Sequence, residues 1–156
     1  MSETIEQSGA CHCRNVKFQV KGNVVLNMLC HCKNCSHNRG SSPVHLMGVA
    51  PADGLAITEG NEKLSKAKAY GTMVYAFCSM CGCLIYAHPE GENFRAVLPT
   101  NFHIENGVSC KLPEEYLPKV HVNYENRQYD WKDNLPKYKT FPPDGVVDNE
   151  GNEVKS

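Results

Sequence analysis

The sequence predicts a mainly β fold built from short antiparallel strands. Segments of strand character, with β-branched and aromatic residues in loose alternation, recur along the chain of 156 residues. Glycine, proline and asparagine separate these segments, as turns require. The segment 62–69 is rich in helix formers, but it is too short to build a helical core. The length of the chain suits a single domain with one core.

The strand pattern appears, in chain order, at 15–20, 24–29, 44–49, 73–77, 84–87, 94–98 and 120–124. The turn signals between these segments lie at 21–23, 51–54, 59–61 and 89–93. We expect one zinc domain over 9–139. The segment 140–156 has little apolar content, and we expect it to be a loosely packed C-terminal extension.

The composition excludes several classes of partner. The formal net charge is −1, so the chain offers no basic footprint for nucleic acid or for an anionic membrane surface. No run of 18 apolar residues is present, and we therefore expect no transmembrane helix. The first residues lack the basic and then apolar layout of a signal peptide, so we expect a cytoplasmic protein, with the nucleus as a second compartment.

Nine cysteines are the most informative feature of the sequence. In a reducing compartment this density indicates metal binding or catalysis rather than disulfides. All but one of the cysteines fall into three clusters, and Cys110 stands alone. The clusters are Cys11 and Cys13 (C-x-C), Cys30, Cys32 and Cys35 (C-x-C-x-x-C), and Cys78, Cys81 and Cys83 (C-x-x-C-G-C).

These spacings suit tetrahedral zinc. Zn–S bonds of about 2.3 Å place the ligand sulfurs only ~3.8 Å apart, and a C-x-x-C turn achieves this because the chain folds back around the metal. Gly82 follows the second cysteine of one such turn, where a left-handed backbone suits glycine. One C-x-C pair and one C-x-x-C pair together give a closed four-thiolate site that joins distant segments and stabilises the fold.

Two pairings of the clusters are open. In the preferred one, the middle cluster stays together as a local group of three thiolates, and the first C-x-C joins the late C-x-x-C. The metal ligands are then Cys11, Cys13, Cys78 and Cys81 at one site, and Cys30, Cys32 and Cys35 at the other. In the rival pairing, the C-x-x-C of the middle cluster joins Cys78 and Cys81 as a zinc ribbon, which leaves the first C-x-C and Cys30 without a site.

The three-thiolate group leaves one position free on a tetrahedral metal, which is the layout of a catalytic zinc. The alternative is a second structural zinc, closed by a further ligand from His31, His37, Cys83 or Cys110. Alternation along the chain turns His12 and His31 away from the metal. His37 and Arg39 directly follow the group, and they are candidates for a proton shuttle and for an anion contact.

The motifs resemble those of the glutathione-dependent formaldehyde-activating enzymes, a family that includes the centromere protein V type domain. The resemblance rests on 9–13, on 30–35 with Gly40, on 77–82, and on the closing segments 121–124 and 131–138. It implies an Mss4-like fold of short antiparallel sheets around zinc sites. It also implies two zincs per chain, held by the two groups of cysteines in the preferred pairing.

The resemblance further implies an activity that joins formaldehyde to glutathione, or more broadly carbon–sulfur lyase chemistry. The expected partners are a small thiol such as glutathione and an aldehyde or a thio-adduct. The expected catalytic residues are Cys30, Cys32, Cys35, His37 and Arg39. The alternative from another class is a non-catalytic zinc module that binds a protein partner, as in Mss4-like or centromere protein V-like domains.

Overall fold

The computed structural model describes residues 3–68, 71–104 and 111–155. Strands dominate these residues, and the one α-helix among them is α1 (Lys33–Arg39). The mainly β fold expected from the sequence is therefore confirmed. The chain forms two compact units, one from Met1–Leu26 with Met47–Tyr116 and the other from Asn27–Leu46 with Leu117–Ser156.

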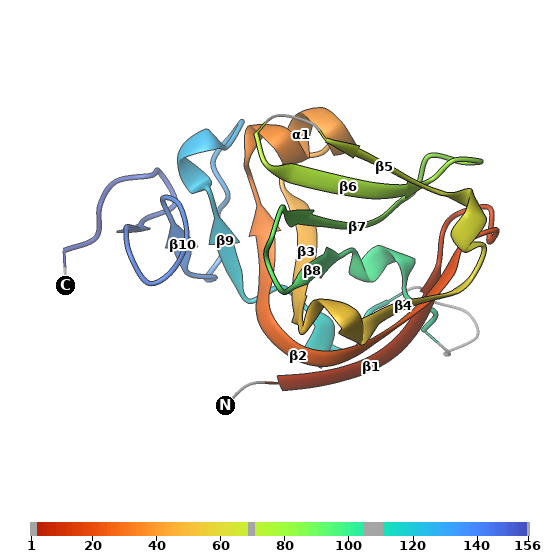
Figure 1. Cartoon of the computed structure of the whole chain (residues 1–156). Coiled ribbons are helices and arrows are strands. Elements are labelled where there is room, and N and C mark those ends of the chain that lie inside the picture. Colours follow the sequence, from red (N-terminus) through yellow and green to blue (C-terminus); the bar gives the residue numbers. More distant parts are fainter. Residues whose placement is uncertain (1–2, 69–70, 105–110, 156) are drawn as a thin grey trace. The chain divides into compact units, whose positions relative to one another are not determined.

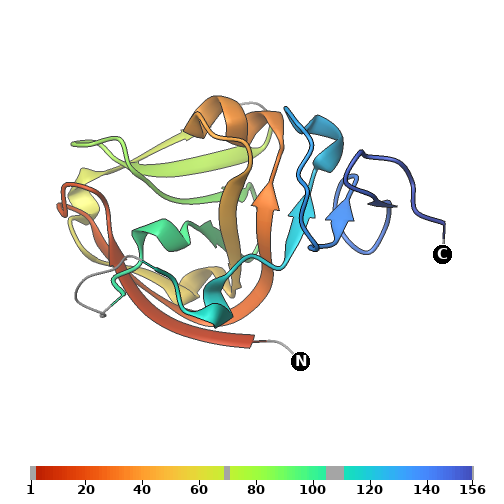
Figure 2. The ribbon, with the colours of Figure 1, turned by 180° about the vertical axis from the view of Figure 1, so that it is seen from behind.

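The first unit is a sheet of mostly neighbouring antiparallel strands. Its hydrogen-bonded order is β2-β3-β8-β7-β6-β5, and β1 and β4 also pair with β2. Figures 1 and 2 both show β1 lying along β2 from the N-terminal end. The strands are β1 (Glu3–Ala10), most of β2 (Lys17–Cys30), the end of β3 (Val44–Ala50), β4 (Leu55–Glu59), β5 (Leu64–Lys68), β6 (Met73–Cys78), β7 (Leu84–Pro89) and β8 (Arg95–Val97). Short 3-10 turns lie at Ala52–Gly54, Asn61–Lys63, Pro99–Asn101 and Glu114–Tyr116.

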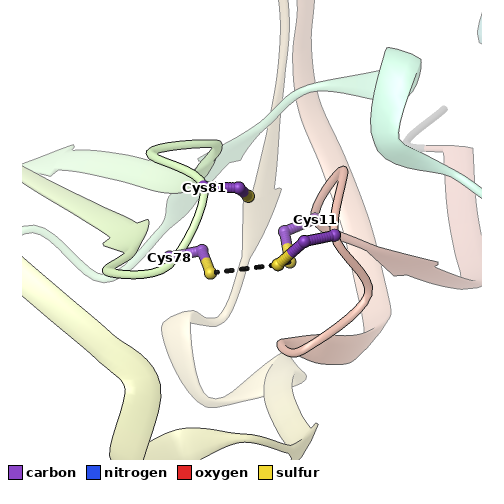
Figure 3. A group of neighbouring side chains, drawn as sticks. Cys11, Cys78 and Cys81 are labelled. Atoms are coloured by element: carbon purple, nitrogen blue, oxygen red, sulfur yellow. Dashed lines mark hydrogen bonds between the residues drawn. The ribbon is translucent and has the colours of Figure 1, made fainter.

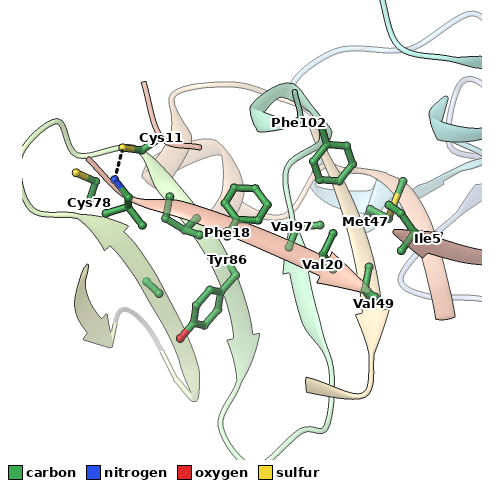
Figure 4. Close-up of a cluster of buried hydrophobic side chains, with 13 residues drawn as sticks. Ile5, Cys11, Phe18, Val20, Met47, Val49, Cys78, Tyr86, Val97 and Phe102 are labelled. Atoms are coloured by element: carbon green, nitrogen blue, oxygen red, sulfur yellow. Dashed lines mark hydrogen bonds between the residues drawn. The ribbon is translucent and has the colours of Figure 1, made fainter. Parts of the chain in front are cut away.

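The core of the first unit follows a two-residue period on the first half of β2. On β2, Phe18 and Val20 are buried, whereas Gln19 between them is exposed. Figure 4 shows these two side chains among the apolar residues of the other strands. The same cluster includes Cys11 and Cys78. The first group of cysteines is therefore continuous with the hydrophobic core.

The second unit contains the last residues of β2, the start of β3, α1 and the C-terminal strands. Those strands are β9 (Val120–Val122), β10 (Lys137–Tyr138) and β11 (Val146–Val147), with a 3-10 turn at Tyr124–Asn126. β9 pairs in parallel with both β2 and β10, so the sheet is mixed and not wholly antiparallel. β11 adds to β10 in the antiparallel sense, and Val147 on β11 is buried.

One of the expected local features is wrong. The expected turn at 21–23 is absent, because β2 continues through it as a single strand of 14 residues. Gly22 is needed there for a close approach: a Cβ at this position would lie 2.5 Å from the carbonyl oxygen of Ala50. The helix formers of 62–69 include Leu64–Lys68, which forms β5 and pairs with β6.

Besides β5 and the short strands β10 and β11, three elements add to those expected from the sequence. β1 and β4 both pair with β2, and α1 follows its last residue after two intervening residues. None of the helices within residues 3–68, 71–104 and 111–155 is long and apolar enough to cross a membrane.

Candidate metal centres

The first group of cysteines comes from two loops of the first unit. Cys11 and Cys13 follow β1, Cys78 ends β6, and Cys81 lies in the loop between β6 and β7. The Sγ atoms of Cys11 and Cys13 are 3.6 Å apart, and those of Cys13 and Cys78 are 3.7 Å apart. Figure 3 shows the side chains of the two loops turned toward one another. These separations match the ~3.8 Å between sulfurs on a tetrahedral zinc.

Both loops are fixed by their own backbone hydrogen bonds. The amide of Cys11 donates to the carbonyl of Val16 at 3.0 Å, and the amide of Gly82 donates to the carbonyl of Cys78 at 2.8 Å. Gly82 has φ +76°, the left-handed conformation that the sequence predicts for this glycine. The loops therefore hold their sulfurs in place by local bonding, as a structural metal site requires.

The electrostatics of this first group differ from one sulfur to the next. Hydrogen bonds from Asn15, led by its side-chain amide, lower the pKa of Cys13 to about 6. Burial raises the pKa of Cys11 to about 12. A metal that binds the group must therefore displace protons from its buried thiols.

The second group lies where β2 ends and α1 begins. Cys30 is the last residue of β2, Cys32 is the N-cap of α1, and Cys35 is the buried residue of the helix. The Sγ atoms of Cys32 and Cys35 are 3.1 Å apart, and all three sulfurs lie within 4.8 Å of one another. The amide of Cys35 donates to the Cys32 sulfur at 3.2 Å. The sulfur of Cys32 thus caps the helix as a serine or aspartate oxygen would.

Hydrogen bonds within the second group concentrate negative charge on one sulfur. Those from the thiols of Cys30 and Cys35 lower the pKa of Cys32 to about 3. The hydrogen bond to Cys32 raises the pKa of Cys30 to about 11, and hydrogen bonds to both other sulfurs raise the pKa of Cys35. The group is a thiolate held by two thiols, a ready precursor of a metal-bound trithiolate.

The donors of both groups fit zinc, since soft sulfur ligands select it over hard cations. The structure brings the cysteines together in the preferred pairing and not in the rival zinc-ribbon pairing. Among the described residues, the second group gains no fourth histidine, cysteine or carboxylate. The Cys83 thiol donates instead to the carbonyl of Leu84 and to Asn101, and Cys110 lies outside the described residues.

A buried polar chain begins beside the second group. Nε2 of His31 lies 2.8 Å from Nδ1 of His121, and Nε2 of His121 lies 2.8 Å from a carboxylate oxygen of Asp133. The ammonium of Lys137 donates to the other carboxylate oxygen at 2.6 Å. Both imidazoles are fully buried and Lys137 is 2% exposed. Nε2 of His31 is therefore occupied by His121, while its buried Nδ1 has no hydrogen-bond partner among the described residues. His31 is not among the residues whose ligand atoms gather in the second group.

Burial and hydrogen bonding set the protonation states of the residues in this buried polar chain. Burial lowers the pKa of His31 to about 4, and burial also lowers the pKa of His121. Burial alone would raise the pKa of Asp133, but hydrogen bonds from Lys137 and His121 lower it overall. Asp133 and Lys137 thus form an ion pair, and the neutral imidazole of His121 donates a hydrogen bond to the Asp133 carboxylate.

The family model for the glutathione-dependent formaldehyde-activating enzymes matches residues 6–126 of the chain. This protein belongs to that family. The matched range contains every cysteine of both groups. Both groups of cysteines that the structure brings together thus lie in the part of the chain that matches the formaldehyde-activating enzyme family.

Curated relatives of this family member come from fungi. A protein of Penicillium rubens is 29% identical over 85 residues, which covers 53% of this chain and 44% of the relative. A protein of Colletotrichum graminicola is 32% identical over 82 residues, which covers 51% of this chain and 42% of the relative. Both are provisionally named glutathione-dependent formaldehyde-activating enzymes. The match spans less than half the length of these relatives.

A solved crystal structure also resembles this family member. It is a structural genomics protein of Rhodobacter sphaeroides, with a TM-score of 0.54 and 19% sequence identity. The match covers 73% of this chain and 97% of that chain. At this identity the likeness shows a shared fold.

His37 and Arg39, the other residues expected at the site of this family member, occupy different faces of α1. Arg39 lies four residues after Cys35 and so projects from the same helical face, whereas His37 lies two residues after it and projects from the opposite face. His37 is exposed, and the guanidinium of Arg39 donates to the side chain of Asn38 at 2.9 Å.

In the sequence, three residues of the buried polar chain stand out only as members of the closing segments 121–124 and 131–138 that resemble the family. His31 was visible only as a residue between two ligands, and His121 lies 90 positions away from it. Asp133 and Lys137 have a spacing of four but belong to no helix. Only the parallel pairing of β2 with β9 reveals that these side chains meet.

Proposed function

We propose that this protein is a zinc-dependent enzyme that adds a small thiol, with glutathione as the first candidate, to formaldehyde or a related aldehyde. The same site would run the reverse carbon–sulfur cleavage. One observation carries the proposal: the second group offers three sulfur ligands and, among the described residues, no fourth. A tetrahedral metal held there keeps one position for a substrate.

The two groups of cysteines have different roles in this proposal. The first group is a structural site that joins two loops of the core. Cys30, Cys32 and Cys35 hold the metal of the second site. When bound, zinc would favour the deprotonated form of a substrate thiol, whose pKa is otherwise about 8.5.

The reaction needs no oxidant or reductant. A bond forms between the thiol sulfur and the aldehyde carbon, the carbonyl π bond breaks, and the proton lost by the thiol ends on the carbonyl oxygen. The product is an S-hydroxyalkyl adduct. In the reverse direction the hydroxyl loses its proton, the carbon–sulfur bond breaks, and the thiol takes up the proton.

Arg39 and His37 complete the proposal. Arg39 shares a helical face with Cys35, so its guanidinium is the proposed contact for a carboxylate of glutathione. His37 is the proposed proton shuttle to solvent from the exposed face of the helix. The described cysteines are all free thiols, which suits the reducing cytoplasm or nucleus that we propose as the compartment.

The experiment compares zinc-loaded wild-type protein with Cys32→Ser. Calorimetric titration with glutathione is expected to show binding to the wild type and none to the variant. Exchange spectroscopy by NMR is expected to show faster interconversion of glutathione, formaldehyde and their adduct with the wild type only. Cys83→Ser is the matched control, because Cys83 belongs to neither group of ligands, and it should behave as the wild type.

If zinc-loaded wild-type protein binds no thiol and leaves the exchange rate at the uncatalysed value, the enzyme proposal fails. A further protein side chain found as fourth ligand would then favour the non-catalytic module that binds a protein partner.

A further inference from the structure

The sulfur of Cys30 receives a hydrogen bond from outside its own group. The side-chain amide of Asn123 donates to Cys30 Sγ at 3.4 Å across 93 positions of sequence. In the same group, the Cys32 sulfur accepts a hydrogen bond from the backbone amide of Cys35. Asn123 thus donates to the group although it is neither a ligand nor a sequence neighbour of one.

The fold places Asn123 at this sulfur by strand pairing. β9 runs parallel to the end of β2, with Cys30 opposite Val122, and the amide of His31 donates to the carbonyl of Val122 at 3.1 Å. Asn123 is the next residue along the chain. His31 follows Cys30 and His121 precedes Val122, and a hydrogen bond joins their side chains. The strand pairing and this side-chain bond therefore both fix the position of Asn123 relative to Cys30.

The backbone of Asn123 also suits this role. It adopts a left-handed conformation, with φ 53° and ψ 37°, which few residues other than glycine tolerate and asparagine tolerates best. Its amide donates to the carbonyl of Thr140 at 2.7 Å, and its carbonyl accepts from the amide of Asn126 at 3.0 Å. These hydrogen bonds hold the backbone on both sides of the residue whose side chain donates to Cys30.

A hydrogen bond to a thiolate ligand draws electron density from sulfur. Three thiolates more than neutralise a divalent cation, and the metal then binds a further anionic ligand weakly. An N–H donor on one of these sulfurs reduces its donation to the metal and strengthens the hold on a fourth ligand. Buried outer contacts of this kind are worth more than exposed ones, and Cys30 is 4% exposed.

We propose that Asn123 is a positioning residue that tunes the metal held by Cys30, Cys32 and Cys35, and thereby sets its affinity for a substrate thiol. The part about thiol affinity rests on the proposed function. The part about the metal rests only on the amide of Asn123 and the sulfur of Cys30.

The test uses the full chain with Co²⁺ in place of zinc. The sulfur-to-cobalt charge-transfer band of the second group is the part of the spectrum that Cys32→Ser lacks. Asn123→Gly removes the donor and keeps the left-handed backbone, and Asn123→Asp keeps the shape but replaces the donor with an acceptor. Asn126→Asp, on the same 3-10 turn, is the control for the added charge.

We expect this band to move to lower energy in both Asn123 variants, because the sulfur electrons are less stabilised without the N–H donor. We also expect glutathione to bind about tenfold more weakly to the zinc-loaded variants. The content of two metals per chain and the melting temperature should stay close to wild type. Asn126→Asp should change neither the band nor the thiol affinity.

Three results separate the possible failures. An unchanged band in both Asn123 variants overturns the proposal. Loss of the second metal together with the band overturns it as well, because Asn123 would then hold the loop and not tune the metal. A shifted band in variants of a protein that binds no thiol at all would keep the tuning role and reject the proposed enzyme activity.

Discussion

Gly60 packs against the loop that carries Cys11 and Cys13. It has φ +78°, and a Cβ at this position would lie 1.8 Å from the carbonyl oxygen of Asn15. The side chain of Asn15 donates to the Cys13 sulfur, so any shift of this residue moves a ligand contact. Gly60 thus connects the conformation of a turn to the geometry of a metal site.

We predict that Gly60→Ala destabilises the protein by at least about 3 kcal/mol and weakens zinc retention at the first group. The added methyl group forces the backbone of Asn15 to move, in addition to the strain of a left-handed alanine. Gly91→Ala is the control, because Gly91 has φ +85° and no atom within 4 Å of the added Cβ. This control should cost only about 1 kcal/mol.

Thermal or urea unfolding, with zinc release followed by a colorimetric chelator, measures both effects. Equal destabilisation by the two substitutions would show that the contact with Asn15 is unimportant.

Some contacts of single residues could be predicted from the sequence and others could not. The two groups of sulfurs could be inferred because C-x-C and C-x-x-C spacings encode ligand geometry locally. The contact of Asn123 with Cys30 could not be inferred, since it depends on the register between two strands that are distant in sequence. The same holds for His31 and His121.

The strand β3 carries His45, a histidine that is hard to protonate in the folded protein. His45 forms a hydrogen bond of 2.7 Å with the side chain of Asn27 on β2, within the second unit. Burial lowers the pKa of His45 to about 4 from its ordinary value of 6.5. The folded state therefore keeps this imidazole neutral at pH values where the unfolded chain has already taken up the proton.

This difference predicts a loss of stability on acidification. Between pH 6.5 and pH 4 the unfolded chain binds one more proton at His45 than the folded protein, so stability falls as the pH falls through this window. We expect the free energy of unfolding of the wild type to fall more steeply than that of His45→Gln, by up to about 1 kcal/mol per pH unit.

Urea unfolding at several pH values measures the two slopes. Zinc release on acidification affects both proteins, so the difference between the slopes isolates His45. Identical slopes for wild type and His45→Gln would contradict the prediction.

The elements themselves were predictable to different degrees. The segments of β6 and β7 could be found from their β-branched and aromatic content, although both strands bury consecutive residues and not alternate ones. α1 could not be found, since seven residues with a sulfur N-cap carry no helical period. The continuity of β2 through Gly22 could not be found either, because a close approach between strands and a turn both favour glycine.

At the scale of the whole molecule, two groups of ligands predict two metals per chain. We expect elemental analysis of protein produced with adequate zinc to give close to two zinc ions per chain. Cys32→Ser should retain one. A value of one or less for the wild type would reject the assignment of two sites.

The two metals should differ in what they do for stability. The sulfurs of Cys13 and Cys78 lie 65 positions apart in sequence, so a metal there closes a long loop and joins the core. The ligands of the second group lie within six residues and close no long loop. We predict that Cys78→Ser costs more than about 3 kcal/mol, whereas Cys32→Ser costs under about 2 kcal/mol.

Chemical unfolding of both variants, with their metal content, tests this ranking. Wild-type melting behaviour in Cys78→Ser with both metals retained would mean that the first group is not the structural site.

The spacing of the two groups also sets an order of events during synthesis. The ribosome releases five thiols, from Cys11 to Cys35, before the first residue of the late C-x-x-C appears. At about 5–20 residues per second, the emerging chain then waits roughly 2–9 s for Cys81. Throughout that interval Cys11 and Cys13 lack the other two cysteines of their site. The only other cysteines already made, Cys30, Cys32 and Cys35, can bind the same metal ion. A metal ion captured by the first C-x-C in that interval gains its other two protein ligands only when Cys78 and Cys81 appear.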